Sequence, residues 1–204
     1  MHTRSIIASV VGLVVLSGAG LASRGAQRSR EAAVTAVSQI PPPATQLETL
    51  LTRPNTLVTQ DVYRVTTDGL ASSFGLVIDA IVVNTLPVSA AHLQGLRVEV
   101  SEAGPPARSR ISYVDGGELA GLSQALSLMA SQAAQWTARE DTRASEAHFA
   151  TSGGFVIGFR ESNHNQIGYV EAGLVDPTHR TCTLQEFSVI KAAVDDAIAL
   201  LRSK

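Results

Sequence analysis

Two stretches of helical periodicity, each preceded by strand-like segments, constrain the fold of this 204-residue chain most strongly. Apolar residues recur at three- and four-residue intervals in residues 116–136 and again in residues 187–201. About four segments of alternating or continuously apolar character come before each helix, a pattern typical of strands. The sequence therefore predicts an α+β protein with antiparallel sheets and two amphipathic helices packed on one side.

The first group of strand segments has the clearer boundaries. Residues 95–101 alternate cleanly, which points Leu96, Val98 and Val100 toward the core. Residues 74–83 are almost all apolar, which favours a central strand covered on both faces. The other expected strands are residues 62–66 (leading into the hairpin signal Asp68-Gly69), residues 110–114 after the turn Gly104-Pro105-Pro106, and segments around Phe149, Ile157, Tyr169 and Thr181, with a turn at residues 162–165.

The two helices begin with matching signals. Asp115 and Glu118 form a capping-box pattern, and Thr183 and Glu186 repeat it 68 residues later without a gap. This match predicts a β-β-β-β-α duplication of residues 61–138 and 144–204. The alternative is that any two capped amphipathic helices would align in this way.

The predicted order of elements over residues 62–202 is similar to that of the whirly family and its single-stranded-DNA-binding relatives. The resemblance implies helices packed against antiparallel sheets, and it raises single-stranded nucleic-acid binding as one functional alternative. No motif of the family matches residue by residue, so no nucleic-acid site is transferred. With 16 basic against 18 acidic residues and 4% aromatic content, the chain offers little of the basic groove and stacking surface that such binding needs. We therefore expect no nucleic-acid partner.

Residues 1–22 predict that the protein is exported from the cytoplasm. Arg4 precedes an apolar run and then small residues, as in a signal peptide cleaved after Ala19 or Ala22. Ala19 stands where a lipoprotein would need its acceptor cysteine. We expect a periplasmic or secreted protein.

Basic residues after the apolar run support an alternative, a retained N-terminal membrane anchor. Arg24, Arg28 and Arg30 outnumber the one arginine that precedes the run, a bias that favours the cytoplasmic side. Residues 6–22 are short for a membrane span, which needs about 20 apolar residues. An uncleaved N-terminal segment would be the chain's only expected contact with a membrane.

Residues 23–60 are interpreted as a proline-containing linker that carries a short helix. Three consecutive prolines, residues 41–43, favour extended backbone. A capping box of Thr45 and Glu48 then opens about two helical turns with Leu47, Leu50 and Leu51 to bury. This helix either packs on the domain or holds it away from the membrane. Residues 61–204 are expected to form a single domain.

Asp176, His179 and Cys182 are the best cluster of reactive groups in the sequence. A carboxylate could orient His179, and His179 could activate the Cys182 thiol, which raises the alternative of a hydrolase or thiol enzyme. The spacing matches no known nucleophile motif, and the chain has one cysteine, so an intramolecular disulfide is excluded. We favour a buried Cys182, because free cysteine is among the most buried residue types.

Histidines do not predict a metal centre. His148, His164 and His179 are separated by 16 and 15 residues, and this spacing lacks the short pair that preforms a zinc site. His148 is expected to face solvent because it alternates with two apolar neighbours. We predict no metal, cofactor or catalytic residue.

Asp79 is the most unusual residue, because it interrupts an apolar strand. It is either buried and paired with Arg64 of the neighbouring strand, or it points outward at a sheet edge. We favour the edge, because charged residues are rarely fully buried. Gly153-Gly154 is interpreted as a turn and Trp136 as a core or edge-covering residue.

These features favour an exported, non-enzymatic binding or interaction domain. The favoured interpretation rests on the absence of a convergent set of titratable residues in the sequence. The partner is an unknown protein or small molecule, and the pattern leaves the oligomeric state open.

Overall fold

The computed structural model describes residues 43–66, 74–86, 91–102, 107–137, 143–163 and 165–204. The described residues belong to one compact unit, which runs from Pro41 to Lys204, and residues 1–40 lie outside the described part. The expected signal peptide, the Asp68-Gly69 hairpin, the Gly104-Pro105-Pro106 turn and His164 also lie outside the described residues.

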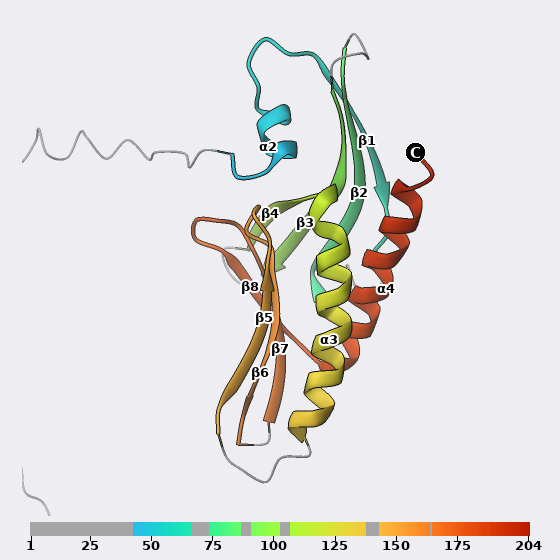
Figure 1. Cartoon of the computed structure of the whole chain (residues 1–204). Coiled ribbons are helices and arrows are strands. Elements are labelled where there is room, and N and C mark those ends of the chain that lie inside the picture. Colours follow the sequence, from blue (N-terminus) through green and yellow to red (C-terminus); the bar gives the residue numbers. More distant parts are fainter. Residues whose placement is uncertain (1–42, 67–73, 87–90, 103–106, 138–142, 164) are drawn as a thin grey trace, which may run out of the picture. The chain divides into compact units, whose positions relative to one another are not determined.

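The described residues form two four-stranded antiparallel sheets in which consecutive strands are neighbours (Figure 1). Each sheet is therefore a simple meander, and the α+β prediction is confirmed. Sheet 1 contains β1 (Val58–Arg64), β2 (Leu76–Thr85), β3 (His92–Glu102) and β4 (Arg108–Asp115). Sheet 2 contains β5 (Ser145–Ala150), β6 (Val156–Ser162), β7 (Asn165–Ala172) and β8 (Thr178–Cys182).

The helices begin where the capping signals predict. Helix α2 (Gln46–Leu51) starts after Thr45, and α4 (Leu184–Leu201) starts after Thr183, each with a complete capping box. A 3-10 turn, η2 (Gly116–Glu118), leads into α3 (Leu119–Thr137). No helix in the described part of the chain is long and apolar enough to span a membrane.

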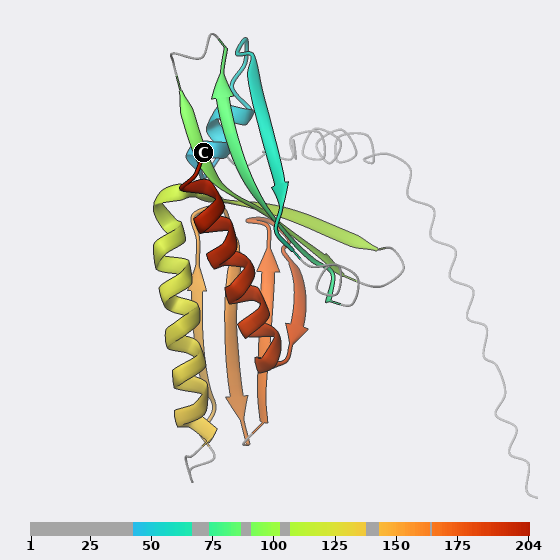
Figure 2. The ribbon, with the colours of Figure 1, turned by 90° about the vertical axis from the view of Figure 1, so that its right-hand side faces the viewer.

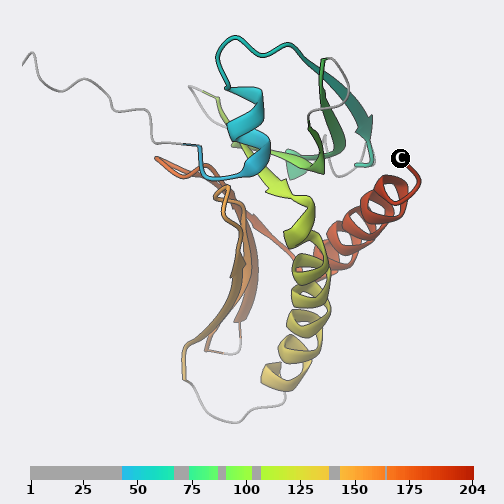
Figure 3. The ribbon, with the colours of Figure 1, turned by 45° about the horizontal axis from the view of Figure 1, so that its top comes forward.

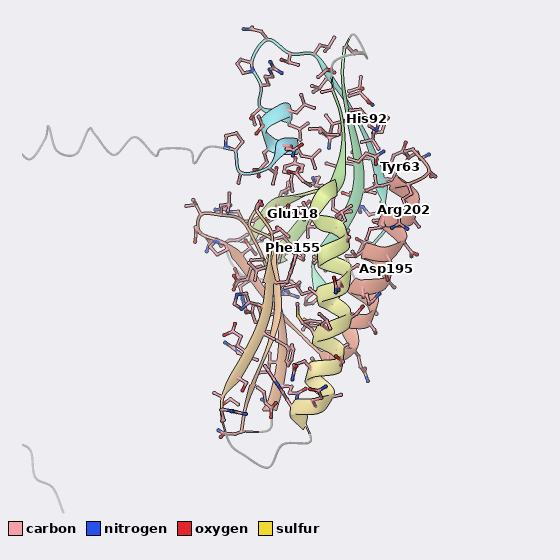
Figure 4. The ribbon with its side chains drawn as sticks, viewed as in Figure 1. Tyr63, His92, Glu118, Phe155, Asp195 and Arg202 are labelled. Carbon is pink, nitrogen blue, oxygen red and sulfur yellow. The ribbon has the colours of Figure 1, made fainter. Side chains whose placement is uncertain are left out.

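Each long helix packs against the sheet of the other half. Helix α3 follows sheet 1 but contacts β5 and β6, whereas α4 follows sheet 2 and contacts mainly β2 (Figures 2 and 3). The two helices also pack side by side, and one apolar core joins both sheets and both helices. At the end of α4, the Lys204 Nζ lies 4.8 Å from the centre of the Tyr63 ring of β1 (Figure 4).

The buried positions of α3 recur in α4, which buries Ala193 in addition. Every buried residue of α3 has a buried counterpart 68 residues later in α4. The duplicated β-β-β-β-α pattern is consistent with this correspondence. The five pairs are Leu119 and Phe187, Leu122 and Ile190, Leu126 and Val194, Met129 and Ala197, and Ala133 and Leu201.

Strand faces follow the predicted alternation. Leu96, Val98 and Val100 of β3 are fully buried. Strand β2 is covered on both faces, because α2 packs Leu47 and Leu50 against the face opposite the main core. The short helix of residues 46–51 therefore packs on the domain.

Candidate functional site

The pairing of His179 with Cys182 that the thiol-enzyme alternative requires does not form. The two residues are three positions apart on β8, so their side chains project from opposite faces of sheet 2. Cys182 belongs to the core, where burial raises the pKa of its thiol to about 12. The prediction that Cys182 is buried is confirmed, and a thiol activated by His179 has no geometric basis.

Asp176 does not orient His179 either. Its carboxylate forms ion pairs with Arg108 and Arg110 of β4, and Arg110 Nη2 lies 3.5 Å from Asp176 Oδ2. His179 lies beside Glu171 instead, with 3.0 Å between Nδ1 and Oε1. The adjacent strand β7 therefore supplies the partner that the sequence interpretation placed in the preceding turn.

Asp79 is buried in the interior of sheet 1, so the favoured edge position is wrong. Strand β2 has neighbours on both sides, and Asp79 is 1% exposed. Arg64 Nε lies 2.5 Å from Oδ1, which confirms the predicted partner, and Arg97 Nη1 lies 3.0 Å from Oδ2. Burial is tolerated because each carboxylate oxygen accepts a charged hydrogen bond.

The strand registers identify the residues of sheet 2 that correspond to Asp79 and its two arginine partners in sheet 1. Asp79 faces Arg64 and Arg97 across the ladder of sheet 1. In sheet 2, the corresponding register row places Gly158 between His148 and Tyr169. A glycine therefore stands where the first half has its buried carboxylate.

A pocket of about 340 Å³ lies on this outer face of sheet 2. Its lining carries two imidazoles, two carboxylates, a guanidinium, a phenol and two apolar side chains. The lining residues are Glu146, His148, Ala150, Val156, Arg160, Tyr169, Glu171 and His179.

Gly158 allows Tyr169 to cross the pocket floor. A Cβ atom at position 158 would lie 2.7 Å from the Tyr169 hydroxyl and 2.7 Å from the Cβ of His148. The Tyr169 hydroxyl donates a hydrogen bond to Glu146 Oε1, and the ring stacks on His179 with centroids 5.6 Å apart. Burial, together with the hydrogen bond to Glu146, raises the pKa of Tyr169.

Two donor side chains of the pocket have no hydrogen bond to any other described residue. Glu146 is bonded to Tyr169, and Glu171 is bonded to His179. Arg160 and His148 are exposed and unpaired within the described part of the chain. The pocket thus presents a guanidinium and an imidazole to solvent.

The histidines of the pocket do not complete a metal site. His148 faces solvent as predicted, and it shares the pocket with His179. Among the described residues, no group of three or more histidine, cysteine, aspartate or glutamate side chains is arranged to hold a metal ion. His164 lies outside those residues.

Two other hollows have fewer ionisable side chains available to bind a ligand. A larger one of about 720 Å³ flanks α2, but Arg53 is its one ionisable lining residue among the described residues. A second, of about 500 Å³, lies where α2 meets the start of α3. There Asp115 accepts hydrogen bonds from the backbone N–H groups of Gln46 and Leu47 at 2.7 and 3.0 Å, so its carboxylate already has a structural role.

Glu118 also lines the hollow where α2 meets the start of α3. Its Oε1 accepts hydrogen bonds from the backbone N–H and the hydroxyl of Ser152, at 2.8 and 3.1 Å, in the turn before β6 (Figure 4). Gly154 in that turn has a φ of 76°, which confirms the predicted turn at Gly153-Gly154. Trp136 packs on the Phe159 ring at 4.7 Å between centroids, as predicted for a residue that covers the core.

Sequence reasoning missed Glu146, Arg160, Tyr169 and Glu171. Each is an outward-facing residue on a different part of sheet 2, and nothing in its local sequence marks it. The register of the three strands β5, β6 and β7 brings them together. Comparison with protein-family models, curated proteins and solved structures found no match.

Proposed function

We propose that this chain is an exported binding domain and that the pocket on sheet 2 is its binding site. One observation carries the proposal: the charged groups at corresponding positions are paired with one another in one half and partly unpaired in the other. In sheet 1, Arg64 and Arg97 both pair with Asp79. In sheet 2, Gly158 makes room for the Tyr169 hydroxyl, and the pocket beside it is bordered by Arg160 and His148, which have no partner among the described residues. An open polar pocket on a four-stranded sheet is suited to selective binding of a small ligand.

The lining favours binding over covalent catalysis. It includes no serine, threonine or cysteine, and Cys182 faces the opposite side of β8. Glu171 and His179 form a hydrogen-bonded pair, but none of the residues that line the pocket is a serine, threonine or cysteine that this pair could activate. Nucleic-acid binding has little support, because the pocket has one arginine and its tyrosine is 7% exposed.

The proposed location rests on residues 1–22. A charged start, an apolar run and small residues support export, and the ligand would then be met outside the cytoplasm. The test is native mass spectrometry of protein recovered from the extracytoplasmic fraction. Cleavage of about 22 residues should remove about 2 kDa. Recovery only from the cytoplasm would contradict export, and an intact chain held in the membrane would support the anchor instead.

The binding site is tested by amide NMR with a library of small polar fragments. We expect shifts confined to β5, β6, β7 and β8 around the pocket. Gly158→Ala should abolish them, because the added methyl displaces the Tyr169 hydroxyl. Gly117→Ala is the matched control, since a Cβ there meets nothing within 4 Å. Shifts elsewhere only, or none at all, would contradict the proposed site.

A further inference from the structure

We infer that the ligand of this pocket is an elongated zwitterion of the size of a short peptide. Its carboxylate would bind Arg160 and His148, and its ammonium group would bind Glu171. The inference rests on the proposed function and specifies the ligand class for the same site.

The anionic end of the ligand is inferred from Arg160 on β6, which does not pair with the carboxylate opposite it on β5. Glu146 lies directly opposite Arg160 in the strand register and is the natural ion-pair partner. The Tyr169 hydroxyl engages Glu146, and Arg160 has no hydrogen bond to any described residue. His148 lies two residues from Glu146 along β5, on the same face, and also has no partner among the described residues. Two adjacent free donors, one of them a guanidinium, fit a carboxylate.

The cationic end of the ligand follows from Glu171 on β7. Its side chain is 31% exposed, and His179 occupies Oε1. The second carboxylate oxygen, Oε2, makes no hydrogen bond within the described residues and borders the pocket. A carboxylate with one free oxygen fits an ammonium donor. The lining carries Glu146, Glu171 and Arg160, so a purely anionic ligand would meet two carboxylates and one guanidinium.

The separation of the two ends sets the length of the ligand. Glu171 faces Val156, which is four residues from Arg160 along β6. Four residues of strand span about 13 Å, and the long Arg160 side chain shortens this gap by several ångströms. An α-amino acid is too short to bridge the two groups. A peptide of two or three residues adds about 3.3–3.6 Å per residue and reaches both.

The apolar part of the pocket favours small side chains on that peptide. The two apolar lining residues, Ala150 and Val156, lie in the register row of Glu171. Trialanine is therefore a suitable probe.

The test is a calorimetric titration with trialanine, its C-terminal amide and its N-acetyl derivative. Arg160→Gln and amidation should each weaken binding roughly tenfold, because each removes a charged hydrogen bond. Combined, they should weaken it no more than either does alone, since both remove the same contact. Glu171→Gln and acetylation should behave in the same way. Arg202→Gln and Asp196→Asn, two exposed positions on or next to α4, are the matched charge controls.

The outcomes separate this inference from the proposed function. Equal binding of trialanine and its amide, or additive losses in the combined experiments, would overturn the zwitterion. Fragments that shift the pocket amides while trialanine does not bind would also overturn it, with the binding site retained. If no fragment shifts the pocket amides, both proposals fail.

Discussion

Arg64 and Asp79 face each other across β1 and β2, with Arg64 Nε 2.5 Å from Asp79 Oδ1. The two side chains have very different surroundings: 59% of the arginine is exposed, whereas 1% of the aspartate is exposed. The aspartate therefore depends on its partners far more than they depend on it. Removing the charge of Asp79 and removing that of Arg64 are not equivalent changes.

Asp79→Asn should lower the free energy of unfolding by about 2 kcal/mol, because it breaks charged hydrogen bonds in a buried position. Arg64→Gln should cost at least as much, because it leaves the buried carboxylate of Asp79 with one charged donor fewer. Arg97→Gln should do the same, since it removes the other donor. Urea unfolding at pH 7 measures all three. A clearly smaller loss for Arg64→Gln than for Asp79→Asn would show that the buried carboxylate does not depend on that arginine.

Gly168 and Phe187 provide a test of the duplication. In sheet 1, Leu96 and Leu119 occupy the corresponding register and helix positions. A Cβ at Gly168 would lie 2.4 Å from the Phe187 ring, so Gly168→Ala should cost about 1–3 kcal/mol through overpacking. Adding Phe187→Leu, as in the first half, should recover part of that loss. A double variant whose loss equals the sum of the single losses in urea unfolding would argue against equivalent packing.

Asp115 should control the attachment of α2. Asp115→Ala removes the acceptor of the Gln46 and Leu47 N–H groups, and we expect those amides to exchange at least tenfold faster with solvent. Stability should fall by about 1–2 kcal/mol. Hydrogen exchange read by NMR checks both residues. Thr183→Ala, which removes the cap of α4, is the control that should leave the α2 amides unchanged.

Cys182 should react slowly with iodoacetamide in the native state at pH 8 and rapidly after unfolding. Burial raises the pKa of the thiol from 9.0 to about 12, so the unfolded chain releases this proton at lower pH than the folded chain. The associated stability is complete below pH 9 and is lost as the pH rises toward 12. The loss is up to about 1.4 kcal/mol per pH unit.

Cys182→Ala isolates this effect. Unfolding free energies of the wild type and of Cys182→Ala should converge or cross as the pH rises above 9, because only the wild type carries the thiol. A constant difference between them up to pH 11 would contradict a raised thiol pKa. Fast native alkylation would do the same.

Local patterns in the sequence predicted the helices, their capping residues and the faces of β3, because these depend on residues within one turn or one strand. The partner Arg64 could be named because the sequence predicted that its strand precedes the strand of Asp79 in one hairpin. Arg97 could not, since its approach to Asp79 depends on the register of β2 with β3. The pocket was harder to predict, because Glu146, Arg160 and Glu171 come together only when the register of three strands is known.

The misplaced pairing of His179 with Cys182 has a simple cause. Proximity along the chain suggested a pair, but three residues along a strand reverse the direction of the side chain. The same alternation places His179 beside Glu171 and turns Cys182 toward Gly168. Strand alternation, applied to residues 178–182 before any chemistry, would have excluded the pair.

The exchange of helices between the two sheets makes the halves dependent on each other. Helix α3 belongs to the first half by connection and to sheet 2 by contact, and α4 shows the reverse. A chain cut between β5 and α3 would give two fragments, each with an uncovered sheet and a helix whose apolar stripe has no partner. Neither fragment is a self-sufficient folding unit, so the pair should assemble only on mixing and should unfold in a single transition.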